Sequence, residues 1–168
     1  GLIDASFRNL VVLFPITCVV LLVSVMALFG RLAPAAVALG VSLVAVLWTM
    51  GFSAAIDPRF NIFTAVVPAV VVIVSFSDII HLWSAWLTEL RHGRSRDEAI
   101  LSSAADVGRA CLLTSATTFV GFVSLSFVPT PAFRLLGVVL GFGVGVALLL
   151  AMTAVPIVLS FLPPPPTR

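Results

Sequence analysis

Two titratable residues, Asp78 and His81, lie inside the apolar stretch VSFSDIIHLWSAW, which covers residues 74–86. Because they are three residues apart, a helix would place them on one face, one turn from each other. A low-dielectric site disfavours the charged form of a carboxyl, so such a group can take up and release a proton near neutral pH. An unperturbed imidazole titrates in the same range. The two residue types at this spacing therefore predict a proton relay.

The composition indicates where such a relay would lie. The chain has 168 residues, of which 61% are hydrophobic and 10% are charged, whereas soluble domains average about 25% charged residues. The mean hydropathy is +1.24, and the net charge of +2 is too small to indicate nucleic-acid binding. Cys18 and Cys111 lie within apolar runs and indicate neither a metal site nor a disulfide framework. We therefore expect an integral membrane protein.

The apolar runs predict an all-α membrane protein with five transmembrane helices in one domain over residues 1–168. A helix needs about 20 apolar residues to cross the hydrocarbon core, and five segments fit that length. The expected spans cover about residues 10–29, 32–56, 60–86, 110–128 and 135–162. The connector 88–109 is polar and is expected at the cytoplasmic interface. Within it, Ser95 and Glu98 form a capping box that predicts a helix beginning near Arg96 and continuing into the fourth span.

The expected depth of Asp78 makes it a candidate functional residue. The middle of the third span would lie near Ile73, which places Asp78 roughly 7 to 8 Å toward the cytoplasmic side, still within the hydrocarbon. An acid there costs about 2.5 to 3.5 kcal/mol on insertion scales, and no Arg or Lys is nearby in sequence to pair with it. The alternatives are a neutral, hydrogen-bonded packing role for Asp78 and an interfacial place for His81 beside Trp83 and Trp86.

The fourth span offers hydroxyl partners for the carboxyl. Thr114, Ser115, Thr117 and Thr118 fall within one stretch of it, and hydroxyls can hydrogen-bond across helices or hold water near a carboxyl. Thr114, Thr117 and Thr118 are therefore possible relay partners. The alternative is that each hydroxyl bonds a carbonyl of its own helix.

Glycine and proline positions bear on helix packing. The last span repeats glycine every four residues, at Gly137, Gly141 and Gly145, a spacing that permits close approach of membrane helices. We also expect Gly121 to mediate helix packing. Pro68, in the third span, is expected to kink or loosen that helix.

The arginines predict the orientation. With five spans, one side carries six of them and the other three: Arg31, Arg91, Arg94, Arg96, Arg109 and Arg168 against Arg8, Arg59 and Arg134. The positive-inside rule makes the first side cytoplasmic. The N-terminus is then extracytoplasmic and the C-terminus cytoplasmic, which suggests a further span or domain upstream.

Enzyme functions are disfavoured. Intramembrane aspartyl chemistry needs two acids, and Asp78 is the lone acid within the expected spans. The sequence contains neither H-E-x-x-H nor G-x-S-x-G. We therefore expect no enzyme activity, no metal and no cofactor.

The order of motifs resembles a known family. FRNL comes first, then NIFTAVVPAVVVIVSFSDIIHL, a basic connector with RSRDEAI, VGRACLLTSATTFVGFVSL, and a glycine-rich last span. This pattern is similar to the membrane half-domain of the resistance–nodulation–division (RND) superfamily. Within it, the pattern looks most like the MMPL and hopanoid-exporter branch, which is related to sterol-sensing domains.

The resemblance implies spans two to six of an RND half in an inner (plasma) membrane. It also implies an extracytoplasmic domain and a second membrane half, or a homo-oligomer. The family's acid couples proton entry to export of hydrophobic or lipid-like substrates, a role that would fall on Asp78 with His81 beside it. Many members carry an acid where this chain has Ser77, so the pattern departs there. The alternative function is a sterol-sensing-like, lipid-responsive regulatory module, and the substrate itself is not predicted.

Overall fold

The computed structural model describes residues 2–30, 32–58 and 64–161, and these residues form an all-α bundle without strands. Five helices are long and apolar enough to cross a membrane, as the sequence predicts. A short 3-10 helix, η1, follows the fourth of them. The helices are α1 (Leu2–Phe29), α2 (Leu32–Ile56), α3 (Val67–Arg91), α4 (Arg96–Ser124), η1 (Leu125–Phe127) and α5 (Pro131–Phe161).

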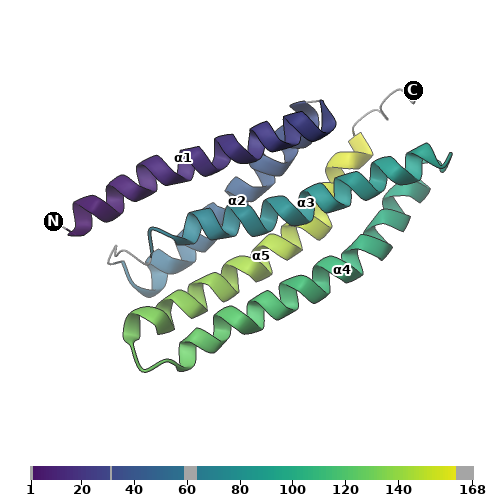
Figure 1. The fold of residues 1–168 in the computed structure, drawn as a ribbon. Coiled ribbons are helices and arrows are strands. Elements are labelled where there is room, and N and C mark those ends of the chain that lie inside the picture. The colour runs from purple at the N-terminus through teal and green to yellow at the C-terminus, as the bar shows by residue number, and fades with distance from the viewer. Residues whose placement is uncertain (1, 31, 59–63, 162–168) are drawn as a thin grey trace.

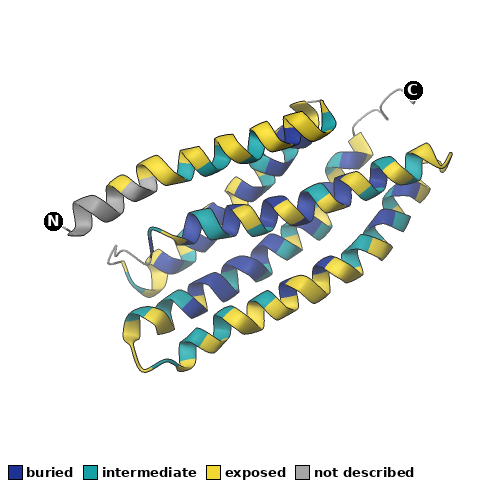
Figure 2. Cartoon of the chain, viewed as in Figure 1, coloured by how far each residue is buried: buried dark blue, intermediate teal, exposed yellow. Residues whose placement is uncertain are grey.

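The five helices lie side by side along one axis, with α1 at one edge of the bundle and α4 at the other (Figure 1). α5 contacts α2, α3 and α4, whereas α1 contacts α2 and α3. Within an apolar 18-residue window of each helix, half of the residues of α3 and of α5 are buried, against 6% for α1 and 11% for α4. The dark blue residues of Figure 2 accordingly concentrate on the central helices. α3 and α5 form the centre of the bundle, and α1 and α4 flank it.

The beginning of α3 differs from the sequence expectation. The helix begins at Val67, after a turn in which the Val67 N–H donates to the Thr64 carbonyl at 3.3 Å. Pro68 lies in the first turn, where a helix loses no hydrogen bond to a missing N–H. The expected kink at Pro68 is therefore wrong. Because the helix begins later than residue 60 and continues to Arg91, Asp78 lies near its middle and not beyond Ile73 toward one end.

The tight reversal between α3 and α4 follows the predicted capping signal. Ser95 is the N-cap of α4, and its backbone N–H donates to the Glu98 carboxylate at 3.0 Å while the Glu98 N–H donates to Ser95 Oγ at 3.4 Å. This reciprocal pair confirms the capping box. Gly93 supplies the left-handed conformation that the turn needs, with φ of 82°, a value that glycine adopts at little steric cost. The reversal fixes α3 antiparallel to α4.

The glycines expected to mediate packing fall into two groups. A Cβ at Gly137 would meet the Phe122 carbonyl oxygen at 2.6 Å, and one at Gly141 would meet Val123 Cγ2 at 2.9 Å. These two glycines permit the close approach of α5 to the end of α4. The other two differ from the expectation, since no atom of the described residues lies within 4 Å of a Cβ at Gly121 or Gly145.

A glycine that the spacing rule does not select also permits close packing. A Cβ at Gly143 would meet Val71 Cγ2 at 2.7 Å and Thr49 Cγ2 at 3.0 Å. Gly143 therefore lets α5 approach both α2 and α3.

Candidate functional site

Asp78 is a buried carboxyl in the middle of the bundle, with 6% of its surface exposed. The Ser115 hydroxyl, on α4, donates to Asp78 Oδ2 at 3.2 Å. Cys111, one turn earlier on α4, also contacts this carboxyl through its thiol. Ser115 and Cys111 are themselves buried. Hydrogen bonding offsets part of the cost of burying a polar group, and here the donor comes from the neighbouring helix, so Asp78 links α3 to α4.

His81 lies on the same side of α3 as Asp78 but is exposed. It lies close enough to Asp78 to interact electrostatically with its carboxyl. Trp83 and Trp86 are buried instead, and their rings pack edge to face with centroids 5.6 Å apart. The two tryptophans therefore belong to the core, whereas His81 faces away from it.

The three predicted relay threonines bond to their own helix. Thr114 Oγ1 donates to the Ala110 carbonyl at 3.1 Å, and Thr117 and Thr118 both donate to the Thr114 carbonyl at 2.8 Å. The hydroxyl that reaches Asp78 belongs to Ser115. As hydrogen-bond donors, these threonines therefore follow the alternative in which each hydroxyl bonds a carbonyl of its own helix. Each hydroxyl can still accept a hydrogen bond.

Asp78 and His81 line an open groove of about 720 Å³ between α3 and α4. Its wall on α3 carries polar residues at helical spacing, namely Ser77, Asp78, His81, Ser84, Thr88 and Glu89. Its wall on α4 carries Ser103, Asp106, Cys111, Thr114, Ser115 and Thr118. Thr117 is not part of the lining. The groove has room for roughly twenty water molecules at about 30 Å³ each.

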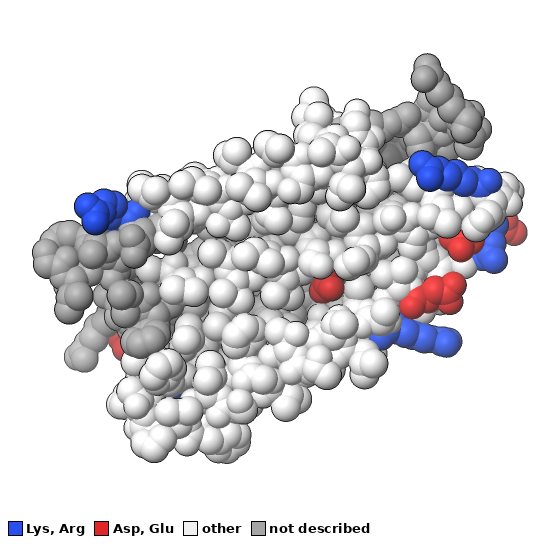
Figure 3. Space-filling model, viewed as in Figure 1, with Lys and Arg blue, Asp and Glu red and all other residues white. Residues whose placement is uncertain are grey.

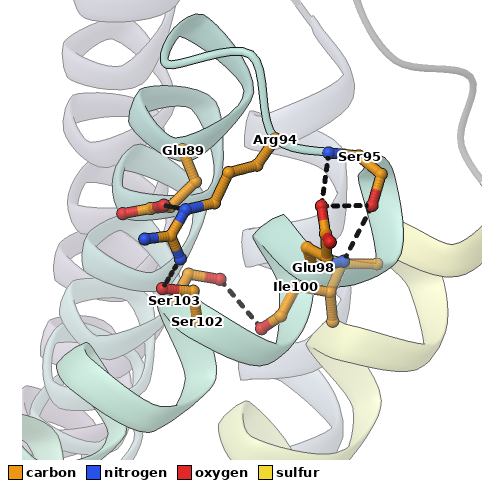
Figure 4. Close-up of polar contacts among 7 residues, drawn as sticks. All are labelled: Glu89, Arg94, Ser95, Glu98, Ile100, Ser102 and Ser103. Atoms are coloured by element: carbon orange, nitrogen blue, oxygen red, sulfur yellow. Dashed lines mark hydrogen bonds and ion pairs between the residues drawn. The ribbon is translucent and has the colours of Figure 1, made fainter.

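Most charged side chains of the described residues lie toward the ends of the helices. Figure 3 shows basic and acidic side chains toward the two ends, with acidic colour also in the middle of an otherwise uncharged body. Near the α3–α4 turn, Arg94 Nε lies 2.9 Å from Glu89 Oε2, and Arg94 Nη1 donates to Ser102 Oγ at 2.6 Å. Figure 4 shows this link between the end of α3 and the first turns of α4.

Several lining residues were not among the predicted site residues. Ser77, Ser84 and Thr88 recur with His81 at spacings of three or four, which is the signature of one helical face. Asp106 was assigned only to the polar connector, and Cys111 only to an apolar run. A search for polar residues at helical spacing on α3 and α4 would have found the groove.

The groove residues offer limited ligand chemistry. Among the residues described, no group of three His, Cys, Asp or Glu side chains lies close enough to hold a metal ion. What remains is a buried carboxyl, an exposed imidazole and several hydroxyls in a groove with room for water, a set that can bind and transfer protons. The fold and this site define a multi-pass, all-α membrane domain with a buried acid on its third helix.

Comparison with known proteins identifies the family. The model of the sterol-sensing domain of SREBP cleavage-activation matches residues 30–162. The chain is 32% identical over 114 residues to a membrane protein of Methanocaldococcus jannaschii, a match that covers 68% of this chain and 29% of that protein. It is 28% identical over 144 residues to the heme uptake protein MmpL11 of Mycobacterium tuberculosis, covering 84% of this chain and 15% of that protein. No solved structure matches the chain.

The chain therefore belongs to the sterol-sensing domain family and is an MMPL-like membrane domain, related to transport. It spans less than a third of the length of these relatives, 29% of one and 15% of the other.

Proposed function

We propose that this domain is the membrane part of a proton-driven exporter of hydrophobic or lipid-like substrates, in which Asp78 couples proton flow to conformational change. The observation that carries the proposal is the position of Asp78. It is buried in the middle of α3, is hydrogen-bonded to Ser115 on α4, and lines a groove with room for water. An intramembrane acid in such a position is functional by default.

The physical basis is the change of charge at the contact between α3 and α4. When Asp78 is ionised, the Ser115 hydroxyl donates to a carboxylate, which is the stronger kind of hydrogen bond. When Asp78 takes up a proton, the charge that favoured water in the groove is lost and the bond to Ser115 weakens. Because the carboxyl joins α3 to α4, the two states favour different separations of these helices.

The neighbouring polar residues have supporting roles in this proposal. His81, exposed on the same groove, exchanges protons with Asp78, either directly or through one water molecule. Thr114 and Thr118 orient that water, since both line the groove and can accept a hydrogen bond. Thr117 does not line the groove, so we assign it no part in the relay.

The surroundings of the domain are part of the proposal. We infer an inner (plasma) membrane, with the N-terminus extracytoplasmic and the α3–α4 turn and the C-terminus cytoplasmic, from the distribution of arginines. The relatives are several times longer than this chain, which is compatible with an extracytoplasmic domain and a second membrane half. In a homo-oligomer, a second copy of the protein would take the place of the second membrane half.

The test is Asp78→Asn in the full-length protein, reconstituted in proteoliposomes and measured for proton flux across the membrane. This substitution keeps the size and hydrogen-bonding capacity of the side chain and removes its titration. We expect proton flux to fall to background, whereas Asp97→Asn, at an exposed acid in the first turn of α4, leaves it unchanged. Unchanged flux in Asp78→Asn would exclude proton coupling by this residue.

A lipid-responsive regulatory module is the second candidate, and the family match supports it. The model that matches residues 30–162 describes a sterol-sensing domain. For such a module, a photoreactive sterol should label the domain equally in wild type and in Asp78→Asn, with no proton flux in either. That outcome would favour regulation over transport.

A further inference from the structure

We propose that Asp106 is a second proton-carrying carboxyl of the α3–α4 groove, which exchanges protons between Asp78 and the water at the α3–α4 turn. This inference rests on the proposed function of Asp78. It is carried by the lining of the groove, because Asp106 on α4 and Asp78 on α3 border the same open space.

The positions follow from the contact between Asp78 and Ser115. Asp106 precedes Ser115 by two and a half turns of α4, about 13.5 Å along the helix at 1.5 Å per residue. Because α3 runs antiparallel to α4, this places Asp106 near the level of Thr88 on α3. Asp106 thus lies, like Glu89 on α3, between Asp78 in the middle of the bundle and the α3–α4 turn at its end.

Between the carboxyls of Asp78 and Asp106, polar residues of α3 line the groove at short intervals. His81 is about 4.5 Å beyond Asp78 along α3, Ser84 about 4.5 Å further, and Thr88 about 6 Å beyond that. Each interval is one that a single bridging water molecule can span. The groove, at about 720 Å³, has room for these waters. Asp106 lies across from the last of these steps.

Among the described residues, Asp106 has no salt-bridge partner, unlike Glu89, the other acid that lines this end of the groove. Glu89 lines the groove, but its carboxylate is paired with Arg94 at 2.9 Å. Asp106 is exposed and, within the part of the chain that the structure describes, has no ion pair or hydrogen bond. Arg109, one turn further along α4, is exposed as well. The Asp106 carboxylate is therefore available to a proton that arrives along the groove.

The transfer involves protons only. Neutral Asp78 gives its proton to a water molecule or to the neutral His81 imidazole and becomes a carboxylate. The imidazolium passes a proton to the next water, and the Asp106 carboxylate accepts it and then releases it to the solvent at the turn. The same steps in reverse return a proton to Asp78.

The experiment compares proton flux in proteoliposomes that contain the full-length wild type, Asp106→Asn, Asp106→Glu or Asp97→Asn. We expect Asp106→Asn to lower the flux by about tenfold, less than the 10²–10⁴ typical of a general acid or base because water can substitute in part. Asp106→Glu should restore most of the flux, since it restores a carboxyl. Asp97→Asn, an exposed acid on α4 that does not line the groove, should behave as wild type.

The outcomes separate this inference from the proposed function. If Asp78→Asn abolishes the flux and Asp106→Asn leaves it unchanged, the role of Asp106 is refuted while that of Asp78 stands. If Asp106→Asn lowers the flux but Asp106→Glu does not restore it, the effect is structural and the inference is also refuted. If the flux does not depend on Asp78, both the proposed function and this inference fail.

Discussion

Gly137 and Gly145 occupy equivalent places in the glycine repeat of α5, yet replacing each with alanine should have opposite effects. A Cβ at Gly137 would lie 2.6 Å from the Phe122 carbonyl oxygen and 2.9 Å from the Ser126 nitrogen. Both are backbone atoms, which cannot rotate away, so the end of α4 must shift. A Cβ at Gly145 meets no atom within 4 Å.

The magnitudes follow from two opposing terms. Overpacking a close contact costs about 1 to 3 kcal/mol, and alanine gains up to about 1 kcal/mol over glycine in a helix interior. Gly137→Ala should therefore lower the free energy of unfolding by up to about 2 kcal/mol. Gly145→Ala should raise it by up to about 1 kcal/mol. Gly141→Ala should lie between them, because the atom it meets at 2.9 Å is the end of the Val123 side chain.

The assay is thermal unfolding of the purified full-length protein in detergent micelles, with the three variants compared with wild type under one condition. The expected order of stability is Gly145→Ala highest, then Gly141→Ala, then Gly137→Ala. An equal loss of stability in Gly137→Ala and Gly145→Ala would refute the reasoning, because it would mean that the repeat acts as a uniform packing face.

Two further substitutions test contacts between helices. Ser115→Ala removes the donor to Asp78 at 3.2 Å and should destabilise the protein by about 1 to 3 kcal/mol in the same thermal assay, whereas Thr117→Ala should change stability by less than about 0.5 kcal/mol. Arg96→Ala removes two hydrogen bonds to the Leu159 carbonyl, at 3.2 and 2.9 Å. It should speed amide hydrogen exchange in the last turn of α5 about fivefold, the effect of about 1 kcal/mol, and unchanged exchange there would contradict the assigned role of Arg96.

Much of the fold was predictable because it depends on local patterns. The five apolar runs are long enough to span a bilayer, and a membrane leaves a long apolar segment few options other than a helix. The capping box at Ser95 and Glu98 located the beginning of α4, since both groups lie within one turn of each other. The expected kink at Pro68 was wrong because the effect of proline depends on its position in the helix, and the beginning of α3 was misplaced.

The site was predictable in part. The carboxyl of Asp78 and its one-turn spacing from His81 are properties of the sequence, and an acid within an apolar run marks a candidate functional site. The sequence did not identify Ser115 as the residue that donates to Asp78, since Ser115 lies among three threonines, Thr114, Thr117 and Thr118, that were predicted as the partners instead. Which of them faces α3 depends on the rotation of α4 about its axis.

The sequence by itself determined the class of protein, the number of spans and the acid within them, because hydropathy and helical spacing act over a few turns of one chain. Only the tertiary structure decided that Asp78 bonds to α4, that Asp106 borders the same groove, and that Gly137 and Gly145 differ. Each of these depends on how two helices are rotated and shifted against each other. That arrangement is set by the packing of the whole bundle, which no local pattern encodes.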